Sequence, residues 1–559
     1  MKFVCDFKKA DKLPIGNRFS NLSFWFSGGT VSDERMWQEW AEAMPEGWLK
    51  KNYPWLEEMQ IFVASGGSYI GYPRQLGDTA ICEFTRDLFK NPADRSMLDD
   101  YDFEPLVRTC RNMLRQGVRP CLKLHAVPVK YSSKPKIGWF RVNSRPPDDY
   151  EVYAAYISAL VQAMVDEFGK KEVCCWRWFV GTEMENPVWW EAPEETGEAN
   201  LKEYLKFHDW SVFALERVLG AECGSIGAHA MMTGGMTGGL WDPEEFMKHC
   251  AGGKNYATGE KGSRLDFFAI SYYDRAPGFI ESDEWQTNLT GDGARLALFE
   301  NFAGNTRAAL NRCGYEKMPI EVSEGGMLFG MDGKWMWNGL APGGVFDATW
   351  TAWAFWKMLE NNVALWSRWG ILRTRGLFRG PEAAVTHAMR MLTALKDSYR
   401  ISVTQDVSEN MIRVVAGISS AKNKVQVLIF HHAPDVTKPA VPAAVELKLE
   451  NLPYAGTVKI SRCTLDSEHG DFWPQWEKDR AMLGLTDKDY FRSREQIDVN
   501  HALINPHHKA VWEHYEKLYE PLSAFPEAEI SSADVNNETL VLSCVMPCFS
   551  ITLFEIEGV

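Results

Sequence analysis

The sequence of 559 residues is short of positive charge and contains no long apolar run. Its 60 Lys and Arg face 75 Asp and Glu, which gives a formal net charge of -15. A field of that sign repels polyanions, so we expect neither nucleic acid nor a membrane as a partner. No stretch approaches the roughly 18 apolar residues of a membrane span. Charges also interrupt the apolar residues of the N-terminus, so a cytoplasmic location is predicted, provided that no signal peptide was removed.

Spacings typical of metal sites and disulfide frameworks are also absent. The twelve Cys are scattered without any Cys-x-x-Cys, and neither His-x-His nor His-Glu-x-x-His occurs. This favours reduced, buried thiols over a disulfide or zinc framework, and it predicts a protein without a metal or cofactor. Repeats, low-complexity tracts and Gly/Ser linkers are missing too, so the domains of this long chain are expected to be packed and not tethered.

Residues 21–400 alternate apolar, strand-like runs with amphipathic helical stretches, which is typical of βα units around a parallel sheet. The runs predicted as strands are residues 22–26, 59–64, 121–124, 174–180, 225–227, 265–270, 318–320 and 364–369. The predicted helices are residues 33–44, 104–115, 149–167, 200–218, 243–250, 293–312, 346–360 and 382–396. This succession of strand and helix units predicts an α/β fold, a closed (β/α)8 TIM barrel.

The pattern changes past residue 400 to alternation without long helices, which predicts an antiparallel β-sandwich over residues 401–559. The predicted strands are residues 411–418, 424–430, 445–449, 457–463, 539–545 and 550–556. Residues 464–524 interrupt them with a polar, aromatic and His-containing excursion, expected to fold over the barrel. Residues 1–20 are expected to pair as a strand with the sandwich.

Two carboxylate-bearing segments follow barrel strands and carry the functional prediction. Gly-Thr-Glu-Met-Glu-Asn occupies residues 181–186, and Glu-Val-Ser-Glu-Gly-Gly occupies residues 321–326. A carboxylate just past the C-terminal end of a barrel strand points into the barrel mouth. Glycoside hydrolysis needs two such carboxyl groups, so Glu183 is predicted as general acid/base and Glu324 as nucleophile. Tyr273, at the end of the sixth strand, is predicted to donate a hydrogen bond that keeps Glu324 ionised.

Other acidic residues compete within the same segments. Glu185 remains an alternative to Glu183 as acid/base. Glu321 lies three residues before Glu324, so strand alternation predicts that the two face opposite ways and that only one reaches the mouth.

Aromatic and His side chains supply the predicted sugar-binding residues. The 23 Trp are about three times ordinary usage, and Trp189 and Trp190 follow the first carboxylate, where either could stack on a sugar face. His125 and His229 end the third and fifth strands and are predicted to face the mouth. A metal site of His and Glu is the weaker alternative, because the ligand spacings are missing. The other predicted substrate-binding residues are Thr182, Asn186 and Trp366.

Further segments resemble glycoside hydrolase family 39 of clan A, whose members include β-xylosidases and α-L-iduronidases. The similar segments are residues 101–103, 117–120, 124–128, 179–183, 265–273, 319–324 and 462–476. The resemblance implies a (β/α)8 barrel followed by a β-sandwich, a retaining double-displacement mechanism, and a Tyr273 that assists the nucleophile.

Departures from the family pattern concern the sugar subsite. Thr182 stands where the family has the Asn that binds the sugar 2-hydroxyl, Met184 replaces a Pro, Ser271 replaces a His, and Ser65 replaces the His of a His-Gly pair. Thr offers one hydroxyl in place of an amide, so an altered minus-one subsite is expected. The prediction is an exo-acting retaining glycosidase for oligosaccharides. An endo-acting polysaccharide hydrolase and a carbohydrate-binding pseudoenzyme are the alternatives, and a homo-oligomer is compatible with the sequence.

Overall fold

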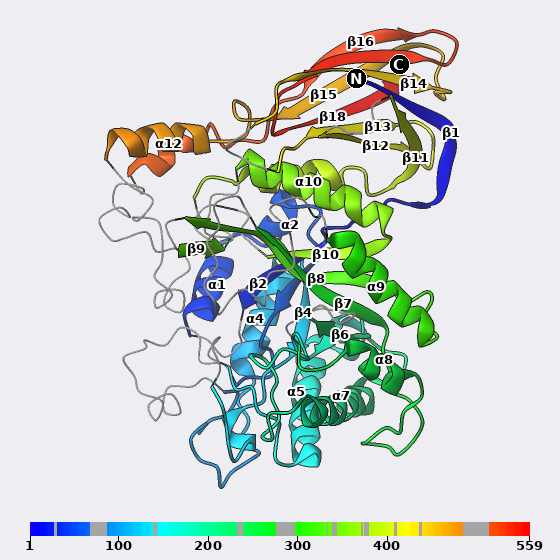
Figure 1. The fold of residues 1–559 in the computed structure, drawn as a ribbon. Coiled ribbons are helices and arrows are strands. Elements are labelled where there is room, and N and C mark those ends of the chain that lie inside the picture. Colours follow the sequence, from blue (N-terminus) through cyan, green and yellow to red (C-terminus); the bar gives the residue numbers. More distant parts are fainter. Residues whose placement is uncertain are drawn as a thin grey trace.

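The chain forms a helix-covered barrel with a second β-sheet beside it, and both termini lie in the second sheet (Figure 1). The computed structural model describes residues 1–26, 31–67, 87–137, 142–231, 239–275, 296, 298–331, 334–337, 344–369, 373, 380–406, 411–434, 439–484 and 514–559. Residues 485–513 of the predicted excursion therefore lie outside the described residues. Within the described part of the chain, none of the helices combines the length and the apolar character that crossing a membrane requires.

Eight parallel strands close into a barrel, which confirms the predicted fold. Their order is β2-β3-β4-β5-β6-β7-β8-β10, and β10 closes the ring by pairing with both β2 and β8. Their bounds are β2 Asn21–Phe26, β3 Glu58–Ile61, β4 Arg119–Leu124, β5 Arg177–Val180, β6 Ser225–Ala230, β7 Phe267–Arg275, β8 Ile320–Met331 and β10 Val363–Trp369. A short strand, β9 (Lys334–Trp337), pairs antiparallel with the far end of β8. The carboxyl ends of the eight strands meet at one rim, the mouth.

Helices cover the outside of the barrel, and local sequence sets their ends. The Asp149 side chain accepts the backbone N–H groups of Glu151 and Val152 and so caps α5 (Tyr150–Phe168). The helix ends at Gly169, whose φ of 80° suits a residue without a Cβ. The other barrel helices are α1 Val31–Ala43, α2 Trp48–Asn52, α4 Glu104–Arg115, α6 Lys170–Val173, α7 Gly197–Leu219, α8 Pro243–Gly252, α9 Phe299–Arg312, α10 Val345–Glu360 and α11 Ala384–Thr393.

A bulge in β8 decides which acidic side chains face the barrel interior. At the base of the barrel, Arg177 forms ion pairs with Glu58 and Glu321. The prediction that Glu321 and Glu324 face opposite ways is wrong, because β8 carries one extra residue, Ser323, relative to β7. A bulge of one residue reverses the alternation of side chains beyond it. Both glutamates therefore point inward, with Glu321 held at the base and Glu324 at the mouth.

The second domain is a nine-stranded, mostly antiparallel sheet, as predicted. Its order is β16-β15-β18-β13-β12-β11-β1-β14-β17, and only the β1–β14 pair is parallel. The end strands β16 and β17 touch, so the sheet curls around its own apolar core. The strands are β1 Lys2–Pro14, β11 Ser398–Gln405, β12 Ile412–Ser419, β13 Val425–His431, β14 Ala443–Glu450, β15 Gly456–Leu465, β16 Glu529–Val535, β17 Leu540–Met546 and β18 Ser550–Gly558.

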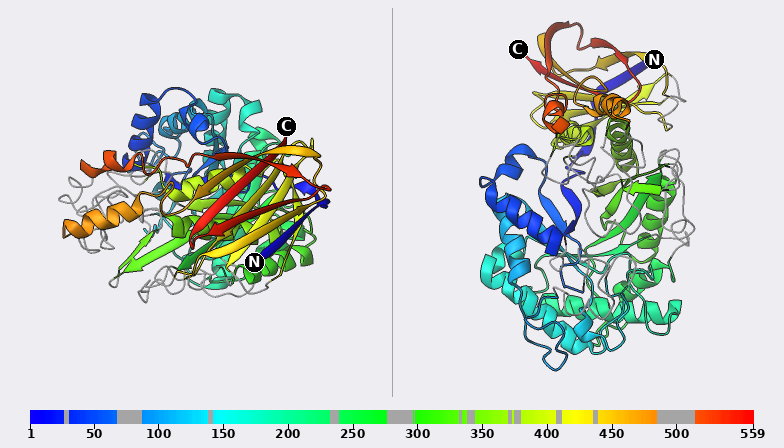
Figure 2. Two further views of the ribbon diagram at one scale, coloured as in Figure 1. Left: turned by 90° about the horizontal axis from the view of Figure 1, so that it is seen from above. Right: turned by 90° about the vertical axis from the view of Figure 1, so that its left-hand side faces the viewer.

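Helix α10 joins the two domains, because it lies between the barrel and the second sheet (Figure 2). Its residues Phe346 and Trp353 contact Phe549 and Phe430 of the second sheet, with ring centroids 5.3 and 6.1 Å apart. A single apolar core runs from the barrel helices into this contact. A further helix, α12 (Trp473–Met482), extends from the second sheet.

One disulfide corrects the expectation that the Cys are reduced thiols. Cys174 and Cys223 are bonded, with Cα atoms 4.8 Å apart. Cys174 precedes β5 and Cys223 precedes β6, and these neighbouring parallel strands start side by side. The intervening helix α7 separates the two Cys by 49 residues, so no spacing motif announces the bond. Nine other Cys of the described residues are free.

Candidate active site

Glu183 lies in a sharp turn directly after β5. Gly181 has a φ of 78°, and a Cβ at this position would lie 3.0 Å from the ring of Tyr204. The Tyr204 hydroxyl also donates to the Val180 carbonyl at 2.7 Å, which fixes the end of the strand. Glu183 itself has a φ of 41°, an uncommon value for a residue with a Cβ. The turn thereby directs the Glu183 side chain across the mouth.

Three hydrogen-bond donors surround the Glu183 carboxyl group. Asn186 Nδ2 and Trp189 Nε1 donate to Oε2 at 2.8 and 3.0 Å, and Ser271 Oγ donates to Oε1 at 2.7 Å. Burial raises the pKa of Glu183, while the three donors and the charge of Lys123 oppose that rise. The carboxyl group is therefore able to exist both as an acid and as a carboxylate.

Glu324 lies opposite, on β8 just after the bulge. The Tyr273 hydroxyl donates to its Oε1 at 2.6 Å, while Oε2 has no hydrogen-bond partner among the described residues. Burial and then the charge of Glu183 raise the pKa of Glu324 to about 8, against the opposing effects of Lys123 and Tyr273. Glu324 is thus less well supplied with donors than Glu183.

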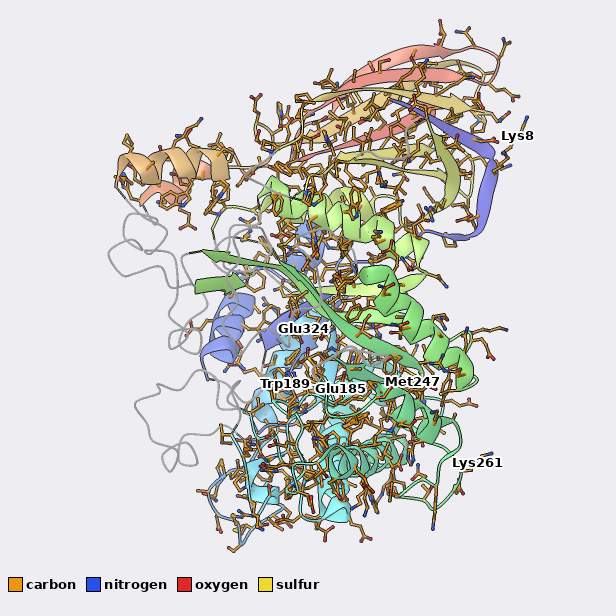
Figure 3. All side chains as sticks on the ribbon, in the orientation of Figure 1. Lys8, Glu185, Trp189, Met247, Lys261 and Glu324 are labelled. Carbon is orange, nitrogen blue, oxygen red and sulfur yellow. A yellow bond between two sulfur atoms is a disulfide. The ribbon has the colours of Figure 1, made fainter. Side chains whose placement is uncertain are left out.

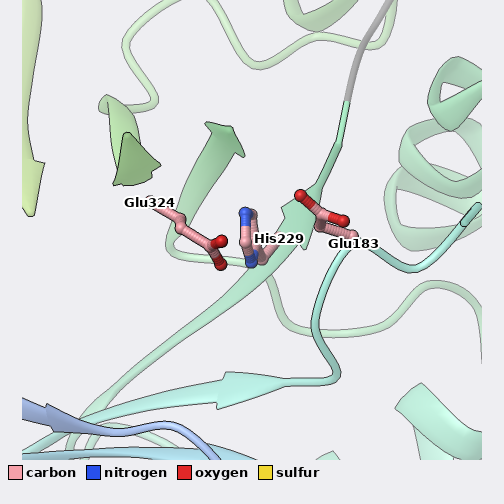
Figure 4. Close-up of side chains that lie close together, drawn as sticks. All are labelled: Glu183, His229 and Glu324. Carbon is pink, nitrogen blue, oxygen red and sulfur yellow. The ribbon is translucent and has the colours of Figure 1, made fainter. Parts of the chain in front are cut away.

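The two carboxyl groups and His229 converge at the mouth (Figure 4). One oxygen of Glu183, one oxygen of Glu324 and one His229 nitrogen all lie within 4.8 Å of one another. Two buried carboxylates this close repel each other, so one proton is shared by the pair over a wide pH range. One carboxyl group is then an acid while the other is ionised, which is the arrangement that acid–nucleophile chemistry requires.

These three residues do not suit a metal ion. His229 Nδ1 lies 3.1 Å from the Lys123 ammonium group, and Nε2 lies 2.8 Å from Ser271 Oγ. A metal ligand needs a free nitrogen lone pair. The ammonium group takes the one on Nδ1, and the other nitrogen faces the hydroxyl.

Lys123 and Ser271 are site residues that the sequence prediction missed. Lys123 lies on β4 and is fully buried beneath the mouth, over the ring of Phe62 at 4.1 Å. It lies two residues before His125, so the period of a strand would have placed both side chains on the interior face. Ser271 was noted only as a departure from the family His, without a role.

His125 and Trp189 line the mouth together with the glutamates. Their rings meet edge to face at 5.6 Å, and neither ring nitrogen of His125 has a partner among the described residues. Burial, followed by the charge of Lys123, lowers the pKa of His125 to about 3, so the ring is neutral. Thr182 lies beside Glu183, and its buried hydroxyl also has no partner within the described segments. Substrate binding by these residues and by Asn186 stays a prediction.

The remaining predicted residues lie away from this cluster. Trp190 packs against Phe207 with ring centroids 4.5 Å apart, and Trp366 stacks on Phe299 at 5.5 Å, on the helix side of the barrel wall. Neither is brought together with the two glutamates. Glu185 belongs to the same segment after β5 as Trp189, and both are labelled in Figure 3, but the Glu185 side chain packs against Gly239.

Sequence comparison identifies relatives for part of the chain. The model of the family described as glycosyl hydrolases family 39 matches residues 80–294. A β-xylosidase of Geobacillus stearothermophilus is 23% identical over 235 residues, which are 41% of this chain and 42% of that protein. The match therefore spans less than half of the length of this relative.

Solved structures match over the whole chain. The GH39 enzyme from Xanthomonas axonopodis pv. citri has a TM-score of 0.64 at 14% identity, with 100% of this chain and 97% of that chain covered. A monomeric β-xylosidase from Caulobacter crescentus CB15 has a TM-score of 0.64 at 15% identity, with coverage of 100% and 99%. Identities this low establish the shared fold alone. The chain is therefore similar in sequence to glycosyl hydrolases family 39 over residues 80–294, and it shares its fold with solved enzymes of that family.

Proposed function

We propose that the protein is a retaining glycosidase with Glu183 as acid/base and Glu324 as nucleophile. The observation that carries this proposal is the approach of their carboxyl oxygens to within 4.8 Å. Retaining enzymes hold the two carboxyl groups roughly 5–5.5 Å apart, whereas inverting enzymes need about 6.5–9.5 Å to admit a water molecule between acid and sugar. The geometry thus favours direct attack by Glu324.

In the first half of the reaction, protonated Glu183 donates its proton to the glycosidic oxygen while ionised Glu324 attacks the anomeric carbon. The bond to the leaving group breaks and a glycosyl ester of Glu324 forms. When Glu183 holds the shared proton, it no longer repels the charge on Glu324, and the Tyr273 hydroxyl stabilises that carboxylate. The developing positive charge of the sugar stabilises it further.

In the second half, Glu183 acts as general base. It takes a proton from a water molecule, which attacks the anomeric carbon and releases Glu324 as a carboxylate. The Asn186, Trp189 and Ser271 donors stabilise Glu183 in the ionised form that this step requires.

The proposed substrate is a small oligosaccharide cleaved at its terminal bond. The unpartnered ring nitrogens of His125 and the hydroxyl of Thr182 are available to sugar hydroxyl groups, and Trp189 offers an aromatic surface. Relatives are named as β-xylosidases, and one solved structure is named as a bacterial orthologue of human α-L-iduronidase. An aryl β-xyloside and an α-L-iduronide are therefore the first substrates to try.

The test is nitrophenol release from a panel of aryl glycosides by wild type, Glu183→Ala and Glu324→Ala, with azide added to rescue the variants. We expect one glycone to be turned over, and azide to give glycosyl azides of opposite anomeric configuration in the two variants. Glu185→Ala is the matched control from the same segment and should need no rescue. Activity that survives Glu324→Ala would refute the assignment, and turnover of internal bonds only would favour the endo-acting alternative.

A further inference from the structure

A chain of hydrogen bonds leads from a buried ammonium group to Glu183. Lys123 Nζ on β4 lies 3.1 Å from His229 Nδ1 on β6, and His229 Nε2 lies 2.8 Å from Ser271 Oγ on β7. Ser271 Oγ in turn lies 2.7 Å from Glu183 Oε1. All four side chains are buried, so bulk water does not compete with these bonds.

The chemistry of each group fixes the direction of the chain. An ammonium group only donates, so His229 Nδ1 must accept from Lys123. Burial, and then the charges of Lys123 and His125, hold the pKa of His229 well below its ordinary value, so the ring is neutral. A neutral imidazole that accepts at Nδ1 carries its proton on Nε2 and donates to Ser271. The Ser271 hydroxyl proton is then left to point at Glu183.

Lys123 is held in place without a carboxylate in direct contact among the described residues. Its ammonium group lies between the rings of Phe62 and Phe179, at 4.1 and 5.1 Å from their centroids. Burial lowers the pKa of Lys123 to about 8, while the charges of Glu324, Cys121 and Glu183 oppose this. The ammonium form therefore prevails at neutral pH and is lost at higher pH.

We propose that Lys123, His229 and Ser271 are positioning residues that keep the Ser271 hydroxyl pointed at Glu183 as a donor and so favour the carboxylate form of Glu183. This inference rests on the proposed function, in which that form activates water. It assigns a task to two residues, Lys123 and Ser271, that were outside the predicted site. His229 becomes a member of this chain of hydrogen bonds from Lys123 to Glu183, which we call the relay. It does not contact the sugar, because both of its nitrogens are engaged.

The test must consider every charged group that faces the relay. The titratable groups are Glu324 and Tyr273 across the mouth and Cys121 and His125 beside Lys123. The neutral donors Asn186 and Trp189 contact the other Glu183 oxygen. Lys123→Met removes the charge together with the first donor. Ser271→Ala breaks the relay but leaves the charge of Lys123 in place. It therefore distinguishes the effect of the relay from the direct electrostatic effect of Lys123 on Glu183.

The first measurement is the pH dependence of kcat/KM for wild type, Lys123→Met, Ser271→Ala and the double variant. Loss of a hydrogen bond to a charged group raises the pKa of Glu183, so the alkaline limb should move up by about one to two pH units in each single variant. Because both changes break the same relay, the double variant should shift no further than the larger single shift. Ser271→Thr retains the hydroxyl and should restore the wild-type limb.

Ser323→Ala is the matched control, because Ser323 is a buried hydroxyl next to Glu324 with no hydrogen-bond partner among the described residues. It should leave the alkaline limb where it is. If Ser271→Ala behaves like this control, or if the single shifts add in the double variant, the relay is refuted. Should Lys123→Met fail to fold, Ser271→Ala and Ser271→Thr decide the matter alone.

A second readout needs no turnover. Carbon-13 NMR of carboxyl-labelled Glu, with Glu183→Gln to assign the signal, follows the titration of Glu183 directly. An inactive protein whose Glu183 titration moves upward in Ser271→Ala supports the relay while the proposed function fails. An active enzyme in which Glu183 has the same pKa in wild type and in Ser271→Ala overturns the relay and leaves the proposed function standing.

Discussion

Replacing Glu324 with Gln should make the protein more stable at neutral pH, even though it removes the proposed nucleophile. Burial and Glu183 raise the pKa of Glu324 from 4.5 to about 8 in the folded state. A carboxyl group whose folded-state pKa lies above its unfolded value favours folding while it is protonated. Its contribution is complete below pH 4.5 and is lost as the pH rises toward 8. At pH 7 the folded state therefore holds Glu324 mostly protonated although the unfolded chain would ionise it, and the uptake of this proton lowers the free energy of unfolding in a way that Gln avoids.

The size of the effect follows from the interval between the unfolded pKa and the pH of the experiment. Linkage from 4.5 to 7 amounts to about 3 kcal/mol in the free energy of unfolding, because each pH unit contributes roughly 1.4 kcal/mol. Part of the shift belongs to the pair with Glu183. We therefore expect Glu324→Gln to raise the free energy of unfolding by about 2–3 kcal/mol at pH 7, and by much less at pH 4.

Denaturant unfolding at several pH values measures this, with Glu321→Gln as the matched control on the same strand. Glu321 is ion-paired with Arg177 at the base of the barrel, so its neutralisation leaves a buried cation with less compensation and should destabilise the protein. Opposite signs for the two substitutions are the expected result. An equal loss of stability in both, or a gain in Glu324→Gln that does not change with pH, would refute the reasoning.

Three further predictions concern the mouth and the disulfide. Tyr273→Phe removes the donor to Glu324 and should move the acid limb of kcat/KM to higher pH by about one unit, whereas an unmoved limb would show that Tyr273 does not support the ionised form. His125→Ala should lower kcat/KM about tenfold through a lost hydrogen bond to sugar, and an unchanged kcat/KM would place His125 outside the subsite. Cys174→Ser should lower the free energy of unfolding by about 2–4 kcal/mol, as expected for a bond that closes a loop between residues 49 apart. A wild-type protein that is equally stable under oxidising and reducing conditions would contradict this.

The sequence predicted the barrel well because the period of apolar residues is a local property. Helix α4 (Glu104–Arg115) has the predicted bounds, since one apolar face and a Pro in its first turn determine it. The strand predicted for residues 174–180 begins too early, because an apolar run looks the same in a strand and in a buried turn. Trp176 packs against Phe168, and β5 begins only at Arg177.

The positions of Glu183 and Glu324 could be predicted, but their surroundings could not. Strand ends indicate which residues reach the mouth, because all parallel strands end at the same rim. The β8 bulge depends on the pairing with β7, and the disulfide depends on the adjacency of β5 and β6. The hydrogen bonds that run from Lys123 through His229 to Ser271 join β4, β6 and β7. None of these contacts produces a motif or a residue spacing that can be recognised in a single sequence.

Because the chain is synthesised from its N-terminus, the strand β1 is made long before the strands with which it pairs. In this strand Phe3, Cys5 and Phe7 are buried in the finished sheet, yet its partners β11 and β14 lie about 400 residues further along the chain. At ribosomal rates of roughly 5–20 residues per second, residue 450 appears about 20 to 90 seconds after the N-terminus. Throughout that time the barrel can assemble while a strand with one apolar face remains unpaired at the end of the nascent chain, where a chaperone could bind it.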